Sequence, residues 1–147
     1  MTSTGLEVFD TTVQESNLWL KGVMRHLPTK DRHAAYLALR AVFHVLRDRI
    51  GPENSVHLAA QLPMLLRGLF FEGWHMAGTP TKERTKGHFL DRVRDSIPDH
   101  DAVSAEAATR AVFWVMCEEL DPGEVVKLIG VLPSELRALW PPSSAAA

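Results

Sequence analysis

Residues 62–74 read LPMLLRGLFFEGW, and residues 132–140 read LPSELRALW. Both stretches contain leucine followed by proline, then leucine followed by arginine, then a large aromatic residue, at a constant separation of 70 residues. Proline disfavours a helical conformation at the residue before it and is tolerated in the first turn of a helix. In each stretch the chain is therefore predicted to change direction and begin a short helix. Leu62, Leu66 and Leu69 of the first copy are expected to face the core.

The separation of 70 residues extends well beyond these two stretches. Residues 18–70 and 88–140 are identical at 19 of 53 paired positions, whereas unrelated sequences of ordinary composition should match at only about three. The run RAVF occurs at 40–43 and again at 110–113. Two copies aligned without a gap indicate a duplicated supersecondary unit, and two copies are too few for a solenoid. The sequence therefore predicts a closed domain in which two similar halves pack about an approximate two-fold axis.

Prolines, capping residues and the helical spacing of apolar residues predict about four helices in each half. Pro28 and Pro98 are expected to end the first helix, and Asp31 and Asp101 to cap the second, which should be the buried centre of each half. The predicted fold is all-α, a single compact domain over 1–141 made of two tandem, pseudo-two-fold-related helical repeats at about 5–75 and 84–141, with a disordered tail at 142–147. The expected helices are 5–27, 31–50, 53–61, 63–71, 84–97, 101–120, 123–131 and 133–140.

The composition is that of an ordinary globular domain. The chain has 147 residues, of which 46% are hydrophobic and 23% charged, and its formal net charge of −2 makes nucleic-acid binding unlikely. Its single cysteine, Cys117, excludes an intrachain disulfide, and on the central helix beside Glu118 it is expected to be an inert thiol. There is no leader at the N-terminus and no apolar run long enough to span a membrane, so we expect a cytoplasmic protein.

The segment after the first Leu-Pro helix differs between the two copies. FFEGWHM follows in the first copy, whereas the second copy stops at LWPPSS. One interpretation is that these aromatic residues pack into the seam between the halves. The other is an exposed apolar patch that binds a partner, rimmed by the basic residues Lys82, Arg84 and Lys86. The partner-binding candidates are Phe70, Phe71, Trp74 and Met76.

Four arginines recur at equivalent positions in otherwise apolar surroundings. A guanidinium there needs carbonyl or carboxylate partners, so these side chains either fasten helix ends or the two halves, or form a pair of anion-binding sites. They are Arg40, Arg67, Arg110 and Arg137.

The sequence contains few motifs typical of metal-binding or catalytic sites. Glu72 and His75 form a single Glu-x-x-His pair, a weak metal-site candidate because no second pair exists to complete a coordination sphere. No nucleophile motif or phosphate-binding glycine loop is present, so no catalytic residue and no cofactor are predicted.

The run AAQLPMLLRGLFFEGW, preceded by LRAVFHVLRDRI and followed by the weaker copy LPSELRALWP, resembles a bacterial family catalogued as domain of unknown function 2267 (DUF2267). The resemblance extends from about Phe9 to Pro141. It implies an all-helical, duplicated fold and brings no assigned activity that could be carried over to particular residues.

The expected function is a non-enzymatic helical interaction module that binds a protein partner or a second copy of itself. The alternative is a small-ligand or metal-binding protein that uses the cleft between the two repeats. Both hypotheses follow from the absence of catalytic motifs, and the difference between the copies favours the first.

Overall fold

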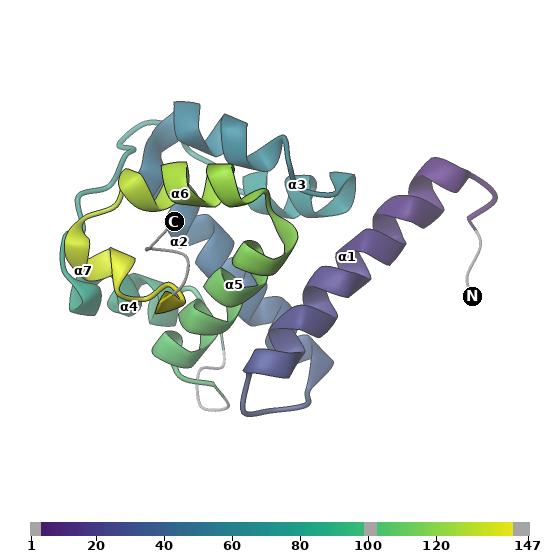
Figure 1. The fold of residues 1–147 in the computed structure, drawn as a ribbon, viewed down its shortest axis with the longest axis horizontal. Helices are drawn as coiled ribbons and strands as arrows, with labels where there is room; N and C mark the ends of the chain where they lie inside the picture. Colours follow the sequence, from purple (N-terminus) through teal and green to yellow (C-terminus); the bar gives the residue numbers. More distant parts are fainter. Residues whose placement is uncertain (1–3, 99–102, 143–147) are drawn as a thin grey trace.

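The computed structural model describes residues 4–98 and 103–142, and within these ranges it contains seven α-helices and no strand (Figure 1). The predicted all-α fold class is confirmed. None of the described helices is long and apolar enough to cross a membrane. The helices are α1 (Glu7–His26), α2 (Arg32–Ala59), α3 (Met64–Phe71), α4 (Lys86–Asp95), α5 (Ala105–Glu119), α6 (Pro122–Gly130) and α7 (Ser134–Arg137).

Two central helices, α2 and α5, pack against each other, and the other helices lie around them (Figure 1). Helix α1 packs more extensively on α5 than on α2, although α2 follows it directly in the chain. Helix α4 likewise packs on α2 as well as on the following α5. The two parts of the chain are thus interlocked around one core.

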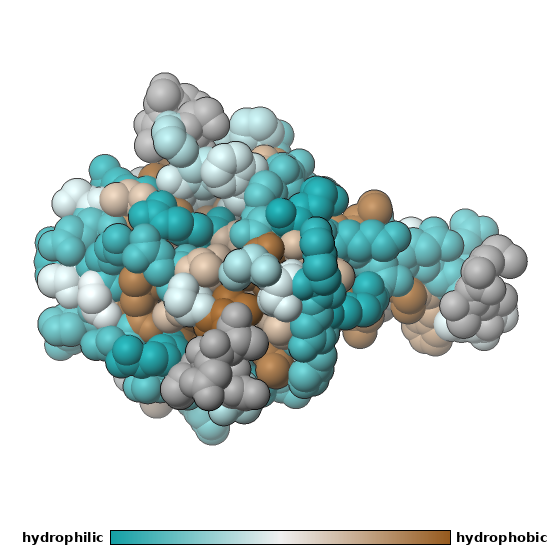
Figure 2. Space-filling model, turned by 90° about the horizontal axis from the view of Figure 1, so that it is seen from below, coloured by the Kyte–Doolittle hydropathy of each residue, from teal (hydrophilic) through white to brown (hydrophobic). Residues whose placement is uncertain are grey.

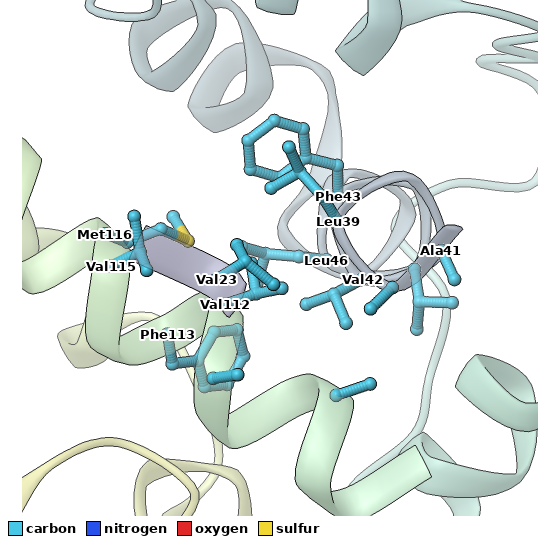
Figure 3. Packing of buried hydrophobic residues seen from close by; sticks show 14 of the residues in the cluster. Val23, Leu39, Ala41, Val42, Phe43, Leu46, Val112, Phe113, Val115 and Met116 are labelled. Atoms are coloured by element: carbon cyan, nitrogen blue, oxygen red, sulfur yellow. The ribbon is translucent and has the colours of Figure 1, made fainter. Parts of the chain in front are cut away.

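That core contains equivalent residues from both copies of RAVF. Phe43 on α2 and Phe113 on α5 are both fully buried, as the close-up in Figure 3 illustrates. Trp19 meets Phe43 edge-on with ring centroids 5.9 Å apart, and Trp140 stacks on Phe113 at 4.0 Å. Small residues line the central helices as the sequence predicts, with the alanines at 35, 38, 41, 108 and 111 all buried.

Several helix boundaries differ from the predicted ones. The Asp31 carboxylate accepts the His33 N–H at 3.0 Å, as expected of an N-cap. In the second half, however, the central helix begins at Ala105, because the Ser104 hydroxyl accepts the Ala107 N–H and provides the cap instead. Asp101 lies outside the described residues, as does the predicted tail beyond 142. The helices expected at 84–97 and 133–140 are shorter, at Lys86–Asp95 and Ser134–Arg137.

The two helices expected at 31–50 and 53–61 are joined end to end as α2, with a sharp kink between them. Gly51 has φ 84° and ψ 171°, a conformation that a residue with a Cβ rarely adopts, and Pro52 follows it. The kink interrupts the helical hydrogen bonds, and side chains replace them: the Ser55 hydroxyl donates to the Arg47 carbonyl, and the Asn54 amide donates to the Ile50 carbonyl.

The packing of α1 on α5 requires a glycine at position 22. A Cβ at Gly22 would lie 3.0 Å and 3.2 Å from the two methyl groups of Val115, closer than ordinary van der Waals contact. We expect Gly22→Val to lower the free energy of unfolding by about 1–3 kcal/mol, the typical cost of overpacking a core. Urea unfolding followed by circular dichroism measures this change.

Gly68→Val is the matched control, because Gly68 is also helical and a Cβ there would meet no heavy atom within 4 Å. The control should be neutral or slightly stabilising, since glycine is a poor helix former. Equal destabilisation by both variants would contradict the close approach of α1 and α5.

Candidate functional site

The aromatic segment that follows α3 begins in the core. Phe70 is fully buried, and its ring meets Phe43 edge-on with centroids 5.5 Å apart. The prediction that Phe70 belongs to a partner-binding surface is therefore wrong. The helical spacing of Leu66 and Phe70 places both on the buried face of α3.

The remaining aromatic residues continue outward from Phe70. Phe71 contacts Phe70 edge-on at 5.4 Å and stacks on Trp74 at 5.0 Å, and both Phe71 and Trp74 are half-buried. Met76 is 56% exposed. A series of ring contacts thus extends the core to the surface, and of the four candidates only Met76 presents most of its side chain to solvent.

Arg47 holds this segment against α2, a role that the sequence analysis missed. Its side chain is only 5% exposed, and Nη1 donates to the carbonyls of Phe70 and Glu72, both at 3.0 Å. Its Nε donates to the Asp48 carboxylate at 2.8 Å. Arg47 follows Phe43 by one helical turn, and this spacing was the available signal for burial.

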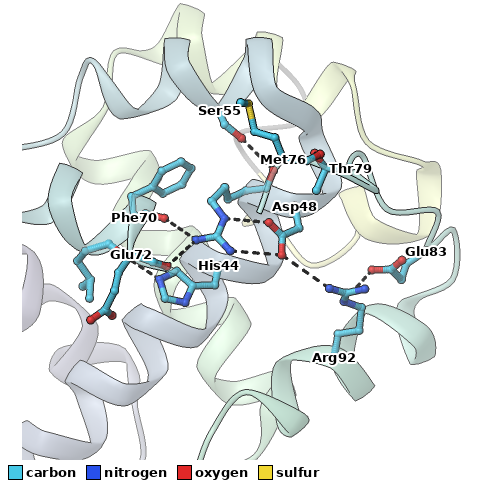
Figure 4. Close-up of polar contacts among 11 residues, drawn as sticks. His44, Asp48, Ser55, Phe70, Glu72, Met76, Thr79, Glu83 and Arg92 are labelled. Carbon is cyan, nitrogen blue, oxygen red and sulfur yellow. Dashed lines mark hydrogen bonds and ion pairs between the residues drawn. The ribbon is translucent and has the colours of Figure 1, made fainter. Parts of the chain in front are cut away.

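Further ion pairs connect Asp48 to α4. The second Asp48 oxygen lies 3.8 Å from Arg92, whose Nε lies 3.1 Å from Glu83 (Figure 4). The network joins α2, the segment after α3, and α4. In the second half, Cys117 replaces Arg47 at the equivalent position.

Two of the four recurring arginines make equivalent contacts. The Arg67 Nη2 donates to the carbonyls of Leu62 and Ala60, at 3.2 Å and 3.5 Å, and its Nε donates to the Ala59 carbonyl at 3.1 Å. The Arg137 Nε donates to the Leu132 carbonyl at 2.8 Å, and Nη2 to the Gly130 carbonyl. Each arginine binds backbone carbonyls at or just after the end of the preceding helix, where carbonyls lack helical partners. This geometry favours the interpretation that they fasten helix ends over anion binding.

The other two arginines make different contacts. Arg40 forms an ion pair with Glu72 at 2.9 Å, and Arg110 donates to the Ala138 carbonyl at 3.1 Å and to Glu106 at 2.8 Å. Because Arg40 neutralises Glu72, the weak metal candidate of Glu72 and His75 has one of its two ligands engaged elsewhere. No group of three metal-ligating side chains occurs among residues 4–98 and 103–142.

A mostly apolar groove with a volume of about 450 Å³ lies between α1, α2 and α3. Its apolar lining comes from all three helices, and Arg32 and Glu72 add charge. Leu65 is 53% exposed, so this lining is open to solvent. The apolar lining includes Val13, Leu20, Tyr36, Leu65 and Leu69.

Hydrogen bonds fix the groove walls. The Thr12 hydroxyl on α1 accepts the Leu65 N–H of α3 at 2.8 Å, so α1 caps the first turn of α3. Asn17 accepts a hydrogen bond from Arg32 and joins α1 to α2. Ser16 lines the groove between these two contacts, and its buried hydroxyl has no hydrogen-bond partner in the structure. The groove is therefore preformed.

One wall of the groove continues past the body of the molecule. The N-terminal half of α1, here called the α1 extension (residues 7–15), projects from the core, and Figure 2 shows apolar residues on this projection. Leu6 and Phe9 are 49% and 50% exposed, and with Val13 they follow helical spacing that places them on the groove side of α1. The groove and the α1 extension form one continuous apolar surface.

Three positions of the groove align with charged residues in the second half of the sequence. Lys86, Glu106 and Glu135 occupy the positions of Ser16, Tyr36 and Leu65. The Lys86 Nζ lies 3.1 Å from Glu106, and the Lys86 N–H donates to Glu135 at 3.0 Å. Hydrogen bonds from Arg110 and then Lys86 lower the pKa of Glu106. These charges satisfy one another where the first half exposes apolar side chains.

The sequence analysis did not find the groove. Phe9 and Val13 of the first helix were assigned to no surface, and the difference between the copies was sought after α3. The replacement of Met64 and Leu65 by Ser134 and Glu135 was the signal that could have located it.

A second, more polar cavity of about 260 Å³ lies between α2 and α6, where the alternative ligand site was expected. Equivalent positions of the two copies line it, namely Asn54 and Glu124, His57 and Lys127, and Leu58 and Leu128. The lining combines apolar side chains with four titratable ones, Glu53, His57, Glu124 and Lys127.

Arg47 is expected to dominate the stability of the segment after α3. Arg47→Ala leaves two carbonyls and Asp48 without their buried partner, and should lower the free energy of unfolding by about 3–5 kcal/mol. Arg40→Ala, the control, removes a more exposed ion pair and should cost at most about 1 kcal/mol. Urea unfolding measures the free energy of unfolding of both variants. Equal losses of stability would contradict the dominant role of Arg47.

His44 predicts a pH dependence of stability. Burial lowers the pKa of His44, the Leu69 carbonyl that accepts its Nε2–H at 2.8 Å opposes this shift, and the charges of Arg47 and Arg40 add to it. Below an unfolded pKa of about 6.5, the unfolded chain binds a proton that the folded chain resists, so stability falls as the pH decreases.

The test compares urea unfolding of the wild type and His44→Gln on both sides of that pH. Glutamine can still donate to the Leu69 carbonyl but does not titrate. The variant should lose less stability on acidification than the wild type, and an equal loss would show that His44 is not responsible.

The sequence comparison agrees with this architecture. The model of the family described as uncharacterized conserved protein (DUF2267) matches residues 16–139, from within α1 to just beyond α7. The sequence has no match among curated proteins. Because the match covers most of the 147 residues, the chain belongs to the DUF2267 family.

Proposed function

We propose that this protein is a non-enzymatic interaction module that receives an amphipathic helix of a protein partner in the groove between α1, α2 and α3. The observation that carries the proposal is the contrast between the halves. Leu65 and Tyr36 leave an open apolar surface where, in the second half, Glu106 pairs with Lys86 and Glu135 accepts the Lys86 backbone N–H. Apolar side chains that stay exposed side by side are typical of binding sites.

The contrast carries weight because we also propose that the halves are tandem repeats related by a pseudo-two-fold axis. The support is the 19 identities, the contacts of Arg67 and Arg137 with the aligned carbonyls of Leu62 and Leu132, and the equivalent positions around the cavity between α2 and α6. Two copies that began alike would have had the same surface at this position. The apolar groove is then a feature of the first copy alone.

The shape of the surface favours a helix over a small molecule. Small-molecule sites are concave and enclose most of their ligand. Here the apolar face continues along α1 to Leu6 and Phe9, beyond the edge of the groove. An amphipathic helix that presents apolar residues every three or four positions would cover such an elongated surface.

The polar residues at the groove favour binding over catalysis. Arg32 is hydrogen-bonded to Asn17, and Glu72 is paired with Arg40. These partners hold the charged groups in place and leave no evident base next to a nucleophile.

Photo-crosslinking in the cells that naturally express the chain tests this proposal. A benzoylphenylalanine at Leu65 is expected to capture a protein, which can be another protein or a second copy of this chain. The same residue at Val56 is the matched control, because Val56 is similarly exposed, at 56% against 53%, and does not line the groove.

Adding Tyr36→Glu, which copies Glu106 of the second half, should abolish the crosslink at position 65 by placing a charge in the groove. The absence of any protein crosslink at position 65, or equal crosslinking at position 56, would contradict the proposed function.

A further inference from the structure

We infer that the helix received by the groove is α1 of a second copy of this chain, with the two α1 helices packed antiparallel about a two-fold axis near Val13. The inference rests on the proposed function, because it requires that the groove receive a helix. It adds the identity of the partner, the orientation of the two helices and the residues that meet.

The groove-side stripe of α1, four apolar residues and Ser16, has the spacing of a helix–helix seam. Its members alternate at intervals of three and four residues, and from first to last they span roughly 21 Å of helix. The members are Leu6, Phe9, Val13, Ser16 and Leu20. The first three of these are exposed on or next to the α1 extension, and the last two line the groove.

An antiparallel arrangement matches large side chains with small ones. With the axis near Val13, Phe9 of each copy lies opposite Ser16 and Asn17 of the other, and Leu6 lies opposite Leu20. Ser16 is small and lies between the two hydrogen-bonded contacts that fix the groove walls, which leaves space for a phenyl ring. Leu65, exposed on α3, would cover the other side of that ring.

The charges of α1 favour the same orientation. Its N-terminal half carries Glu7 and Asp10, and its C-terminal half carries Lys21 and Arg25. Antiparallel packing brings Glu7 of one copy near Lys21 of the other, and Asp10 near Arg32 beside Asn17. Parallel packing would place like charges together.

A second copy also explains why the exposed surface has two parts. A foreign helix could fill the groove, but Phe9 on the α1 extension and Leu6 just before it would then need cover of their own. In a two-fold pair each chain contributes one extension and one groove, so each covers the other's apolar surface in a self-complementary interface.

The first experiment measures the mass of the purified full-length chain by analytical ultracentrifugation over a range of micromolar concentrations. We expect a reversible dimer for the wild type and a dissociation constant raised roughly tenfold or more by Phe9→Glu. Leu18→Glu is the matched control, because Leu18 is 56% exposed on the opposite side of α1 and should leave dimerisation unchanged.

Circular dichroism of each variant separates loss of dimerisation from loss of folding. If Phe9→Glu unfolds, Leu65→Glu replaces it, because that side chain is exposed on a different helix. A wild-type monomer at all concentrations, or a folded Phe9→Glu variant that dimerises like the wild type, overturns the inference.

The second experiment tests the position of the axis by oxidation. In a Cys117→Ser background, Val13→Cys should form an intermolecular disulfide, because the two copies of this position face each other across the axis. Leu18→Cys should not, and equal or absent crosslinking of the Val13→Cys variant contradicts the antiparallel register.

The results distinguish this inference from the proposed function. A monomeric purified protein whose position 65 captures a different protein in cells leaves the groove as an interaction site and overturns only the second-copy inference. A monomeric protein that captures nothing at position 65 overturns both.

Discussion

The close packing of α1 on α5 at Gly22 determines where the rest of the first half can lie. With Val115 directly against the α1 backbone, the C-terminal half of α1 becomes part of the core, where Trp19 and Val23 are buried. A straight helix held at one end extends rigidly at the other, so the same contact directs the α1 extension away from the body. Thr12 then caps α3, and the groove forms between two elements positioned by one contact.

Arg47 imposes a second constraint, and only on the first half. By binding the carbonyls of Phe70 and Glu72, it turns the chain after α3 back across α2, so that Glu72 borders the groove beside Arg40. The second half has Cys117 at this position, and LWPPSS at 139–144 aligns with LFFEGW at 69–74. The two halves therefore share their core residues and differ where the chain leaves the core. Packing constrains Phe43 and Phe113 alike, whereas the surface of each half could change independently.

Local rules predicted most of the fold from the sequence. Helical periodicity and proline positions located the helices because both act within a few residues, and Asp31 acts as the cap that its position implies. The errors came from longer-range effects. The joining of two helices at Gly51 depends on side-chain hydrogen bonds across the kink. The start of α5 depends on which of several possible capping residues accepts the first free backbone N–H groups of the helix. Phe70 and the groove could not be assigned, because an apolar residue on a helix has the same pattern whether its face meets the core or solvent.

Exposed apolar side chains along the groove and the α1 extension reduce solubility. The second half has charged residues at aligned positions, so the fold does not require apolar residues there. In the second half, Lys86, Glu106 and Glu135 align with Ser16, Tyr36 and Leu65, and these groups satisfy one another through an ion pair and a hydrogen bond. Folding alone would therefore permit charged residues in the first half as well. Leu65 is half-exposed there, Ser16 and Asn17 have polar side chains, and Tyr36 carries a hydroxyl group. The groove is better explained by an association in which those apolar side chains are buried, because burial converts the exposed leucine and phenylalanine side chains from a liability into the main source of binding free energy.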